Sequence, residues 1–233
     1  SDVCSSDLPR RGVRGFASAL VVACAMVAVV IVHPFSAPRP DGRLHVEYLD
    51  VGQGDAIFVT FPNGETLLID GGGRRDYKRA GDSDSDAGSF KPDTRTIGES
   101  VVSEVLWFKG YSAIDRVLAT HADADHIQGL CDVAKNFSVG SALFGRTPPA
   151  NPEFAELRSI LDRRGIPLAT VERGELLNIG GALVEVLYPL RPSAPDDASD
   201  NDHSVVLRIT YGQRSFLFTG DIEQDRKSTR LNS

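Results

Sequence analysis

The longest apolar run of the chain lies near its N-terminus. Residues 16–32 (FASALVVACAMVAVVIV) carry no charge, and Arg10, Arg11 and Arg14 precede them. About 17 apolar residues is the lower limit for a helix that spans a bilayer. The run therefore predicts a membrane helix with its flanks over residues 9–35, with a signal peptide and a buried core helix as the alternatives. The arginines predict that the part of the chain after the helix lies outside the cytoplasm.

After a proline-containing linker over residues 36–43, short segments alternate apolar and polar positions. Such segments are typical of β-strands when they are rich in β-branched and aromatic residues and bounded by turn residues. We predict strands over residues 44–50, 56–61, 66–70, 114–119, 168–171, 183–187, 204–210 and 215–219. Apolar residues at helical spacing predict helices over residues 98–109 and 152–164. Strands in both halves with helices between them predict an α/β fold, in which helices cover the outer faces of the sheets.

Composition narrows the class of protein. The chain has 233 residues, of which 41% are hydrophobic and 24% are charged, so it can bury one sizeable core. The net charge of -7 argues against a generic surface for polyanions. A carboxylate-rich metal site can still act on phosphodiesters, because bound cations invert the local charge. Cys4, Cys24 and Cys131 form no CxxC pair, which argues against structural zinc and against a disulfide framework.

Both ends of the chain resemble translated adaptor sequence. Residues 1–8 and 226–233 are therefore predicted to be non-native tails, with native tails as the alternative. The segment that remains after the linker predicts one globular domain over residues 44–225.

The strongest chemical signal directly follows an apolar segment. His121, Asp123, Asp125 and His126 place four side chains of metal-ligand type within six residues. Imidazole nitrogens and carboxylate oxygens suit zinc, manganese or iron. The alternative is a solvated acidic turn in which Asp125 caps a helix beginning near Ile127. A cap explains one acid but not two histidines that flank two acids, so the pattern predicts a metal site.

The run His-x-Asp-x-Asp-His resembles the histidine motif of the metallo-β-lactamase superfamily. Its aspartate at the second place, with residues 49–55 (LDVGQGD) and 67–72 (LLIDGG), resembles the C-terminal domain of ComEC-type competence DNA-uptake channel proteins. Residues 201–204 (NDHS) and 218–221 (FTGD) are further matches. The resemblance extends over residues 44–223.

The resemblance implies a fold and a location. The fold is an α/β metallo-β-lactamase-type αββα sandwich, preceded by one transmembrane helix. The implied location is the inner, cytoplasmic membrane, with the hydrolase domain on the extracytoplasmic side. Family members continue to a His-His-Gly-Ser-like stretch that this sequence does not contain. We therefore expect a C-terminally truncated sandwich whose second metal is weakly bound.

The resemblance also implies an activity. It is that of a nuclease with two divalent metal ions, zinc or manganese, which degrades a DNA strand during uptake. Single-stranded DNA would be the substrate, and the membrane and other competence uptake components would be partners. The alternatives are a metallo-hydrolase of a small ester, lactam or thioester, and a non-catalytic domain that guides DNA through the channel.

Carried over residue by residue, the resemblance assigns roles. His121 and Asp123 would bind one metal ion, Asp125 and His126 the other, and Asp221 would bridge both. Asp125 is also the candidate catalytic residue, since it would hold the attacking water.

Other candidates lie outside this ligand set. Asp70 would orient a ligand histidine by a hydrogen bond, as metal-bound imidazoles require. Gln53 either contacts the site or shapes its turn. Candidate site contacts are Asp55, Asn201, His203 and Ser204. For His203 the alternative is a surface histidine with no role in the site.

Overall fold

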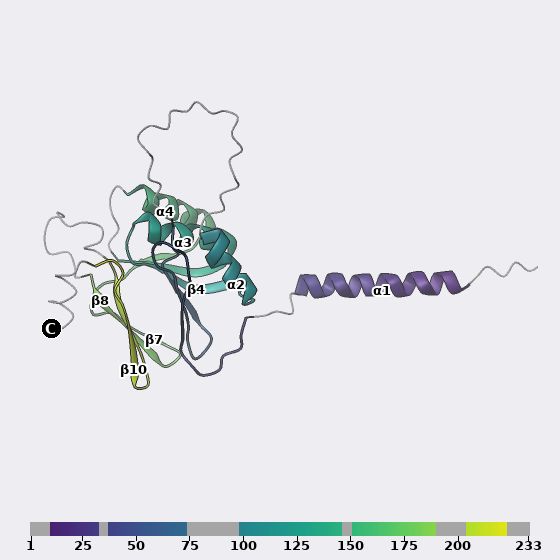
Figure 1. The fold of residues 1–233 in the computed structure, drawn as a ribbon, viewed down its shortest axis with the longest axis horizontal. Helices are drawn as coiled ribbons and strands as arrows, with labels where there is room; N and C mark the ends of the chain where they lie inside the picture. Colours follow the sequence, from purple (N-terminus) through teal and green to yellow (C-terminus); the bar gives the residue numbers. More distant parts are fainter. Residues whose placement is uncertain (1–9, 33–36, 74–97, 146–150, 190–203, 223–233) are drawn as a thin grey trace, which may run out of the picture. The chain divides into compact units, whose positions relative to one another are not determined.

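A computed structural model of the chain describes residues 10–32, 37–73, 98–145, 151–189 and 204–222 (Figure 1). The chain divides into two units, residues 1–36 and residues 37–233.

The N-terminal unit contains one helix, α1 (Arg10–Val32), which covers the predicted apolar run. Within the described residues, no helix combines the length and the apolar character that crossing a membrane requires. The membrane helix stays a prediction.

The second unit contains a six-stranded sheet in the order β1-β2-β3-β4-β5-β6. The first three strands pair antiparallel, and the pairs from β3 to β6 are parallel. The strands are β1 (His45–Tyr48), β2 (Ile57–Thr60), β3 (Thr66–Ile69), β4 (Ala113–Ala119), β5 (Ser138–Phe144) and β6 (Leu168–Thr170).

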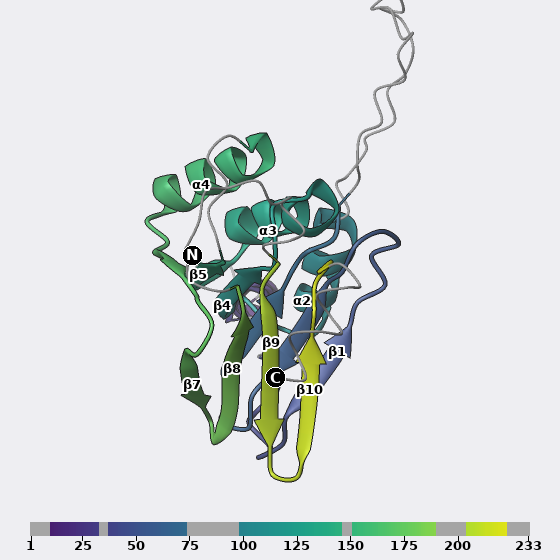
Figure 2. The ribbon, with the colours of Figure 1, turned by 90° about the vertical axis from the view of Figure 1, so that its left-hand side faces the viewer.

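A four-stranded antiparallel sheet follows, in the order β10-β9-β8-β7. Its strands are β7 (Leu176–Ile179), β8 (Ala182–Tyr188), β9 (Val206–Tyr211) and β10 (Arg214–Phe218). The two sheets lie face to face (Figure 2).

Three helices accompany the parallel part of the first sheet, because parallel neighbours need a crossover connection. They are α2 (Glu104–Phe108), α3 (Ala124–Asn136) and α4 (Pro152–Arg164). A π-helical segment, Gly98–Ser103, precedes α2, so the helix predicted over residues 98–109 begins with a wider turn than expected. At α4, Asn151 accepts a hydrogen bond from the Phe154 amide and Pro152 occupies the first turn, as is usual for a helix start.

The central strands of the six-stranded sheet are buried on both faces. On β2, Phe58 packs with the helices, whereas Ile57 and Val59 pack with the four-stranded sheet. Helices α2, α3 and α4 lie on one side of the six-stranded sheet and the four-stranded sheet lies on the other. The α/β prediction is confirmed, and so is the helical cover of one sheet. None of these three helices covers the outer face of the four-stranded sheet.

Two strands were not predicted. In β5, Gly140 interrupts the pattern of strand-forming residues. Glycine is needed there because the Cβ of any other residue would lie 2.6 Å from the Asp115 carbonyl oxygen. For β7, the sequence feature that could have predicted the strand is the pair Gly180-Gly181. Both glycines have positive φ and form the turn that leads directly into β8.

Candidate metal centre

The site begins where two parallel neighbours, β3 and β4, end at the same edge of the sheet. Asp70 directly follows β3, and its amide donates to the carbonyl of Leu118 at 2.8 Å. Its φ of 56° is the only positive φ of a non-glycine residue in the described part of the chain. Aspartate tolerates this left-handed conformation better than most residues. The turn thus directs the Asp70 carboxylate toward the residues that follow β4.

Asp70 is 1% exposed and accepts three hydrogen bonds from the histidine motif. The Thr120 amide donates to Oδ1 at 2.7 Å and the Thr120 hydroxyl to Oδ2 at 2.6 Å. Nδ1 of His126 lies 2.9 Å from the same Oδ2. The carboxylate therefore fixes both the backbone before His121 and the ring of His126, as expected of a group that orients a ligand histidine.

His121 presents one nitrogen for a ligand. Its Nδ1 lies 3.0 Å from the Thr120 hydroxyl, while its Nε2 is buried and has no hydrogen-bond partner. Burial, and then the neighbouring His126, lower the pKa of His121. A neutral imidazole with a buried, unpartnered nitrogen is what a metal ligand must be before the metal binds.

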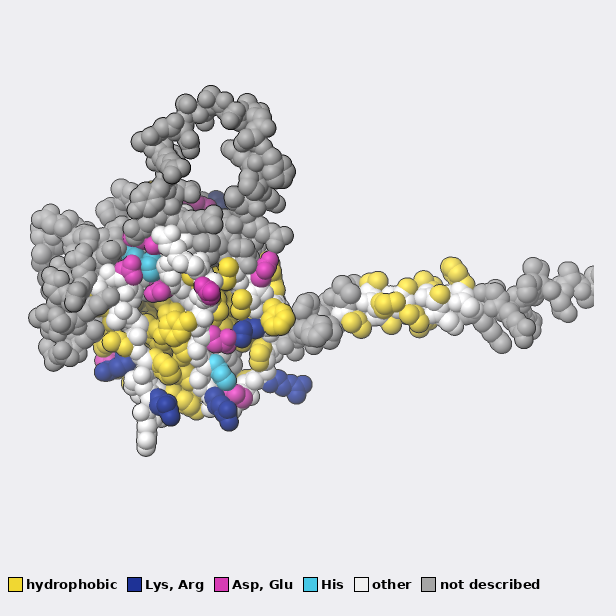
Figure 3. Space-filling view, in the orientation of Figure 1, with side chains coloured by type: hydrophobic (Ala, Val, Ile, Leu, Met, Phe, Trp, Pro, Cys, Tyr) yellow, Lys and Arg dark blue, Asp and Glu magenta, His cyan; other side chains and the backbone are white. Residues whose placement is uncertain are grey.

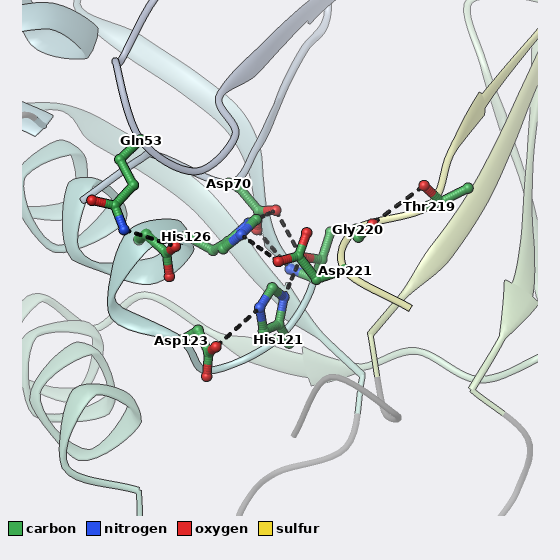
Figure 4. A network of polar contacts seen from close by, with 10 residues as sticks. Gln53, Asp70, His121, Asp123, His126, Thr219, Gly220 and Asp221 are labelled. Atoms are coloured by element: carbon green, nitrogen blue, oxygen red, sulfur yellow. Dashed lines mark hydrogen bonds and ion pairs between the residues drawn. The ribbon is translucent and has the colours of Figure 1, made fainter. Parts of the chain in front are cut away.

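Asp221 reaches this place from the second sheet. It follows β10 through Gly220, whose φ is 49° and whose missing side chain would lie 3.0 Å from the Thr120 side chain. The Asp221 Oδ2 lies 3.5 Å from Nε2 of His126. One ligand atom each from His121, His126 and Asp221 lies within 4.8 Å of the others (Figure 4). The Asp221 side chain is 43% exposed, so the cluster is open to solvent on this side.

His126 sits between two carboxylates. Burial alone would lower its pKa, but the hydrogen bonds with Asp221 and Asp70 and the charges of both outweigh burial and raise the pKa of His126 to about 10. Without metal, His126 therefore holds a proton at neutral pH. A divalent cation would have to displace that proton, which makes metal binding depend on pH.

The other two acids of the motif lie at the start of α3. Asp123 occupies the N-cap position, yet its side chain makes no capping hydrogen bond. One of its carboxylate oxygens lies 3.8 Å from Nε2 of His121 instead. Asp125 is inside the first turn, so the alternative in which it caps a helix starting near Ile127 is wrong. Its Oδ2 lies 3.4 Å from Nε2 of Gln53.

Sequence comparison assigns the family. Residues 49–233 match the model of the Metallo-beta-lactamase superfamily. The chain belongs to this superfamily. It is also 29% identical over 212 residues to ComE operon protein 3 of Bacillus subtilis (strain 168), an alignment that covers 91% of this chain and 26% of the relative. The resemblance to a ComEC-type metallo-β-lactamase domain is confirmed.

Several solved structures are similar to this chain at low identity. CmlA, a diiron beta-hydroxylase from Streptomyces venezuelae, is 22% identical with a TM-score of 0.42, over 78% of this chain and 30% of that chain. A metallo-beta-lactamase from Cronobacter sakazakii with a HARLDQ motif is 13% identical with a TM-score of 0.45, over 83% of this chain and 67% of that chain.

Close backbone contacts hold this superfamily site together. A side chain at Gly129 in α3 would place its Cβ 1.8 Å from the Gly71 carbonyl oxygen. A side chain at Gly54 would place its Cβ 1.6 Å from the Asp125 carbonyl oxygen. Glycine at both positions lets the turn after β3 and the loop after β1 pack directly on the start of α3.

The remaining candidates differ in their surroundings. Ser204 is fully buried, and its hydroxyl has no hydrogen-bond partner among the described residues. The next residue, Val205, donates its amide to the Thr120 carbonyl at 2.8 Å, so Ser204 lies beside the site. Asn201 and His203 lie outside the described residues.

Asp55 and Gln53 belong to the loop between β1 and β2. Burial, followed by the charges of Asp70 and Asp221, raises the pKa of Asp55 against the opposing effect of His126. Gln53 reaches Asp125, as noted above, so it contacts the acids of the motif.

Thr120 is the functional residue that sequence reasoning missed. It links Asp70 to His121 through one hydroxyl. The available signal was its place between a buried strand and the first histidine, where a short hydroxyl side chain meets the end of the neighbouring parallel strand.

Proposed function

We propose that this metallo-hydrolase-fold domain is a divalent-metal-dependent phosphodiesterase that cleaves single-stranded DNA during DNA uptake. The observation that carries the proposal is the convergence of His121, His126 and Asp221 around the buried, unpartnered Nε2 of His121. The similarity to a ComE operon protein supports the DNA substrate.

The donor set fits a divalent cation such as zinc or manganese. His121 would bind through Nε2, His126 through the nitrogen that faces Asp221, and Asp221 through a carboxylate oxygen. Asp123, close to His121, would complete the coordination of this ion, and Asp125 would bind a second one. This grouping departs from the one that the resemblance implies, in which His126 binds the second ion with Asp125, because His126 lies with His121 and Asp221. Such cations would polarise the phosphate and make water nucleophilic at neutral pH.

The residues of the chain then have distinct tasks. Asp70 keeps the ring of His126 in place through Nδ1, and it keeps Thr120 in place through two hydrogen bonds. Thr120 in turn orients His121. Asp125, held by Gln53, is the candidate to orient the attacking water and accept its proton.

Metal content and cleavage test the proposal together. Purified chain should bind zinc or manganese and cut a single-stranded oligonucleotide, and it should leave nitrocefin and thioesters intact. The double variant His121→Ala with His126→Ala should lose both bound metal and cleavage. The matched control is His45→Ala, because His45 also pairs with an acid, Asp41, at 3.0 Å but is exposed and outside the site. A folded double variant with unchanged metal content would refute the ligand assignment. Hydrolysis of nitrocefin or a thioester without DNA cleavage would favour the small-substrate alternative.

We further propose that α1 anchors the domain in the inner membrane, with the membrane and other uptake components as partners. Its uncharged apolar run and the preceding arginines support this placement. The intact chain should stay in the membrane fraction after a carbonate wash, and deletion up to Pro40 should release it. Release of a shortened product from the intact chain would instead establish a signal peptide.

A further inference from the structure

Tyr48 is a large aromatic residue that the fold leaves outside its core. It ends β1, the edge strand of the six-stranded sheet, and it is 69% exposed. Single exposed aromatic residues are common on protein surfaces, so the position of this ring, and not its exposure alone, carries the argument.

The strand register places Tyr48 beside the metal centre. Tyr48 pairs with Ile57, Ile57 pairs with Ile69, and Ile69 directly precedes Asp70. Two strand spacings separate Tyr48 from Ile69, or about 10 Å between their Cα atoms.

The same register fixes the side of the sheet on which the ring lies. Ile57 and Ile69 pack between the two sheets. Residues directly opposite each other on neighbouring strands project to the same face. Val46, two positions before Tyr48, also packs against this inner cluster. Tyr48 therefore projects toward the side from which the second sheet delivers Asp221.

The chain between Tyr48 and the site is held in place. It is the loop over residues 49–55. In this loop the Asp55 backbone carbonyl accepts a hydrogen bond from the Gly72 amide at 2.8 Å, and the Gln53 side chain donates to the Asp125 carboxylate. Gly54 packs directly on the Asp125 backbone. Packing thus holds the loop that joins β1 to the candidate metal centre.

Figure 3 shows hydrophobic side chains as a patch on the face that also presents a group of acid and histidine side chains. The chain is acidic, with a net charge of -7. Some basic side chains in the described part pair with acids, as Lys109 does with Glu47 and Arg116 with Glu65. A generic electrostatic attraction for a DNA backbone is therefore weak, and another source of affinity is needed.

We propose that Tyr48 is a stacking platform for a base of the single-stranded substrate, adjacent to the phosphate held at the metal centre. The inference rests on the proposed nuclease function. Stacking on an aromatic ring suits this task because every base has a flat face, so the contact tolerates any sequence. It also favours single strands, since bases in a duplex are already stacked.

The test compares Tyr48→Ala and Tyr48→Phe in the full chain, with Phe108→Ala as the matched control. Phe108 is another exposed aromatic residue, at 91%, but it lies at the end of α2. Tyr48→Ala should raise KM for a single-stranded oligonucleotide roughly 5- to 100-fold, with kcat and metal content nearly unchanged. Tyr48→Phe keeps the ring and should stay within about 2-fold of the wild type, as should Phe108→Ala.

A substrate series identifies the stacked base. Oligonucleotides with a single abasic residue, moved stepwise past the cleavage position, should contain one position that raises KM of the wild type. At that position the abasic residue should have no further effect on Tyr48→Ala, because the variant and the substrate remove the same contact. Additive effects, or equal KM values for Tyr48→Ala and Phe108→Ala, would overturn the proposal.

Failure of the nuclease function gives a different result. A wild-type chain that cuts no oligonucleotide refutes that function, and fluorescence anisotropy with the same labelled strands then decides about Tyr48. Weaker binding by Tyr48→Ala to the strand with all its bases, and not to the abasic strand, supports stacking. Equal affinities overturn it.

Discussion

The two sheets of the domain differ in how they are covered. The central strands of the six-stranded sheet are buried on both faces, with Phe58 and Leu68 against the helices and Ile57 and Ile69 against the other sheet. The four-stranded sheet buries its inner face, whereas its outer face exposes 47% of Leu217 and buries only a small cluster at one end, around Val206. Strands buried on both sides are continuously apolar, whereas strands with one wet face alternate.

The candidate metal centre draws residues from both sheets. Asp70, His121 and His126 follow or flank the doubly buried strands and are themselves almost fully buried. Asp221 comes from the end of the singly buried sheet, and its side chain is 43% exposed. The difference indicates that the first sheet and α3 fix the geometry of the histidines, while the second sheet supplies one solvent-accessible candidate ligand.

The largest effect on the free energy of unfolding should come from a cavity beside the central strands of the six-stranded sheet. Phe58 is 1% exposed and stacks edge-on against Tyr111, with ring centroids 5.0 Å apart. Phe58→Ala should lower the free energy of unfolding by about 3–5 kcal/mol, because it removes a large packed ring. Leu217→Ala, on the outer face of the other sheet, should change it by less than about 0.5 kcal/mol. Urea unfolding followed by circular dichroism measures both, and similar losses would show that the two sheets do not differ as described.

The next effect concerns the carboxylate that joins the ends of β3 and β4. Asp70→Ala leaves the buried amide of Thr120 without its acceptor and should cost about 2–4 kcal/mol in unfolding free energy. It should also weaken metal binding about 10- to 100-fold, because the His126 ring loses its orientation. Asp115→Ala is the control, since Asp115 also accepts two hydrogen bonds from a threonine, Thr66, but far from the histidines. Equal metal affinities in the two variants would contradict the role of Asp70.

A smaller effect on stability should come from the interaction between protonated His126 and Asp221, which joins the two sheets. In the metal-free protein the raised pKa of His126 stabilises the fold fully below pH 6.5, and this contribution is lost as the pH rises toward about 10. Asp221→Asn should lower that pKa, at about 1.4 kcal/mol for each pKa unit lost. Solvent screening at the exposed Asp221 should keep the change near 1 kcal/mol. The difference in unfolding free energy between wild type and variant, measured at pH 7 and pH 10 in chelator, should narrow at the higher pH. A constant difference would mean that Asp221 does not act on His126.

Local patterns were sufficient for much of the fold. The pattern before the histidine motif predicted β4, and the patterns over residues 204–210 and 215–219 predicted β9 and β10. These elements depend on side-chain periodicity and turn residues, which are local properties of the sequence. The π-helical start before α2 and the short β7 depart from those patterns, and they were not predicted.

The sequence by itself predicted the kind of site, because two histidines and two acids in one short run after a buried strand are side chains of metal-ligand type. Only the tertiary structure decided which groups converge. Asp70 meets Thr120 and His126 because β3 and β4 pair in parallel, and Asp221 reaches His126 because the second sheet packs across the first. These contacts join residues 50 or more positions apart, and such distances depend on strand register and sheet packing, which no local pattern encodes.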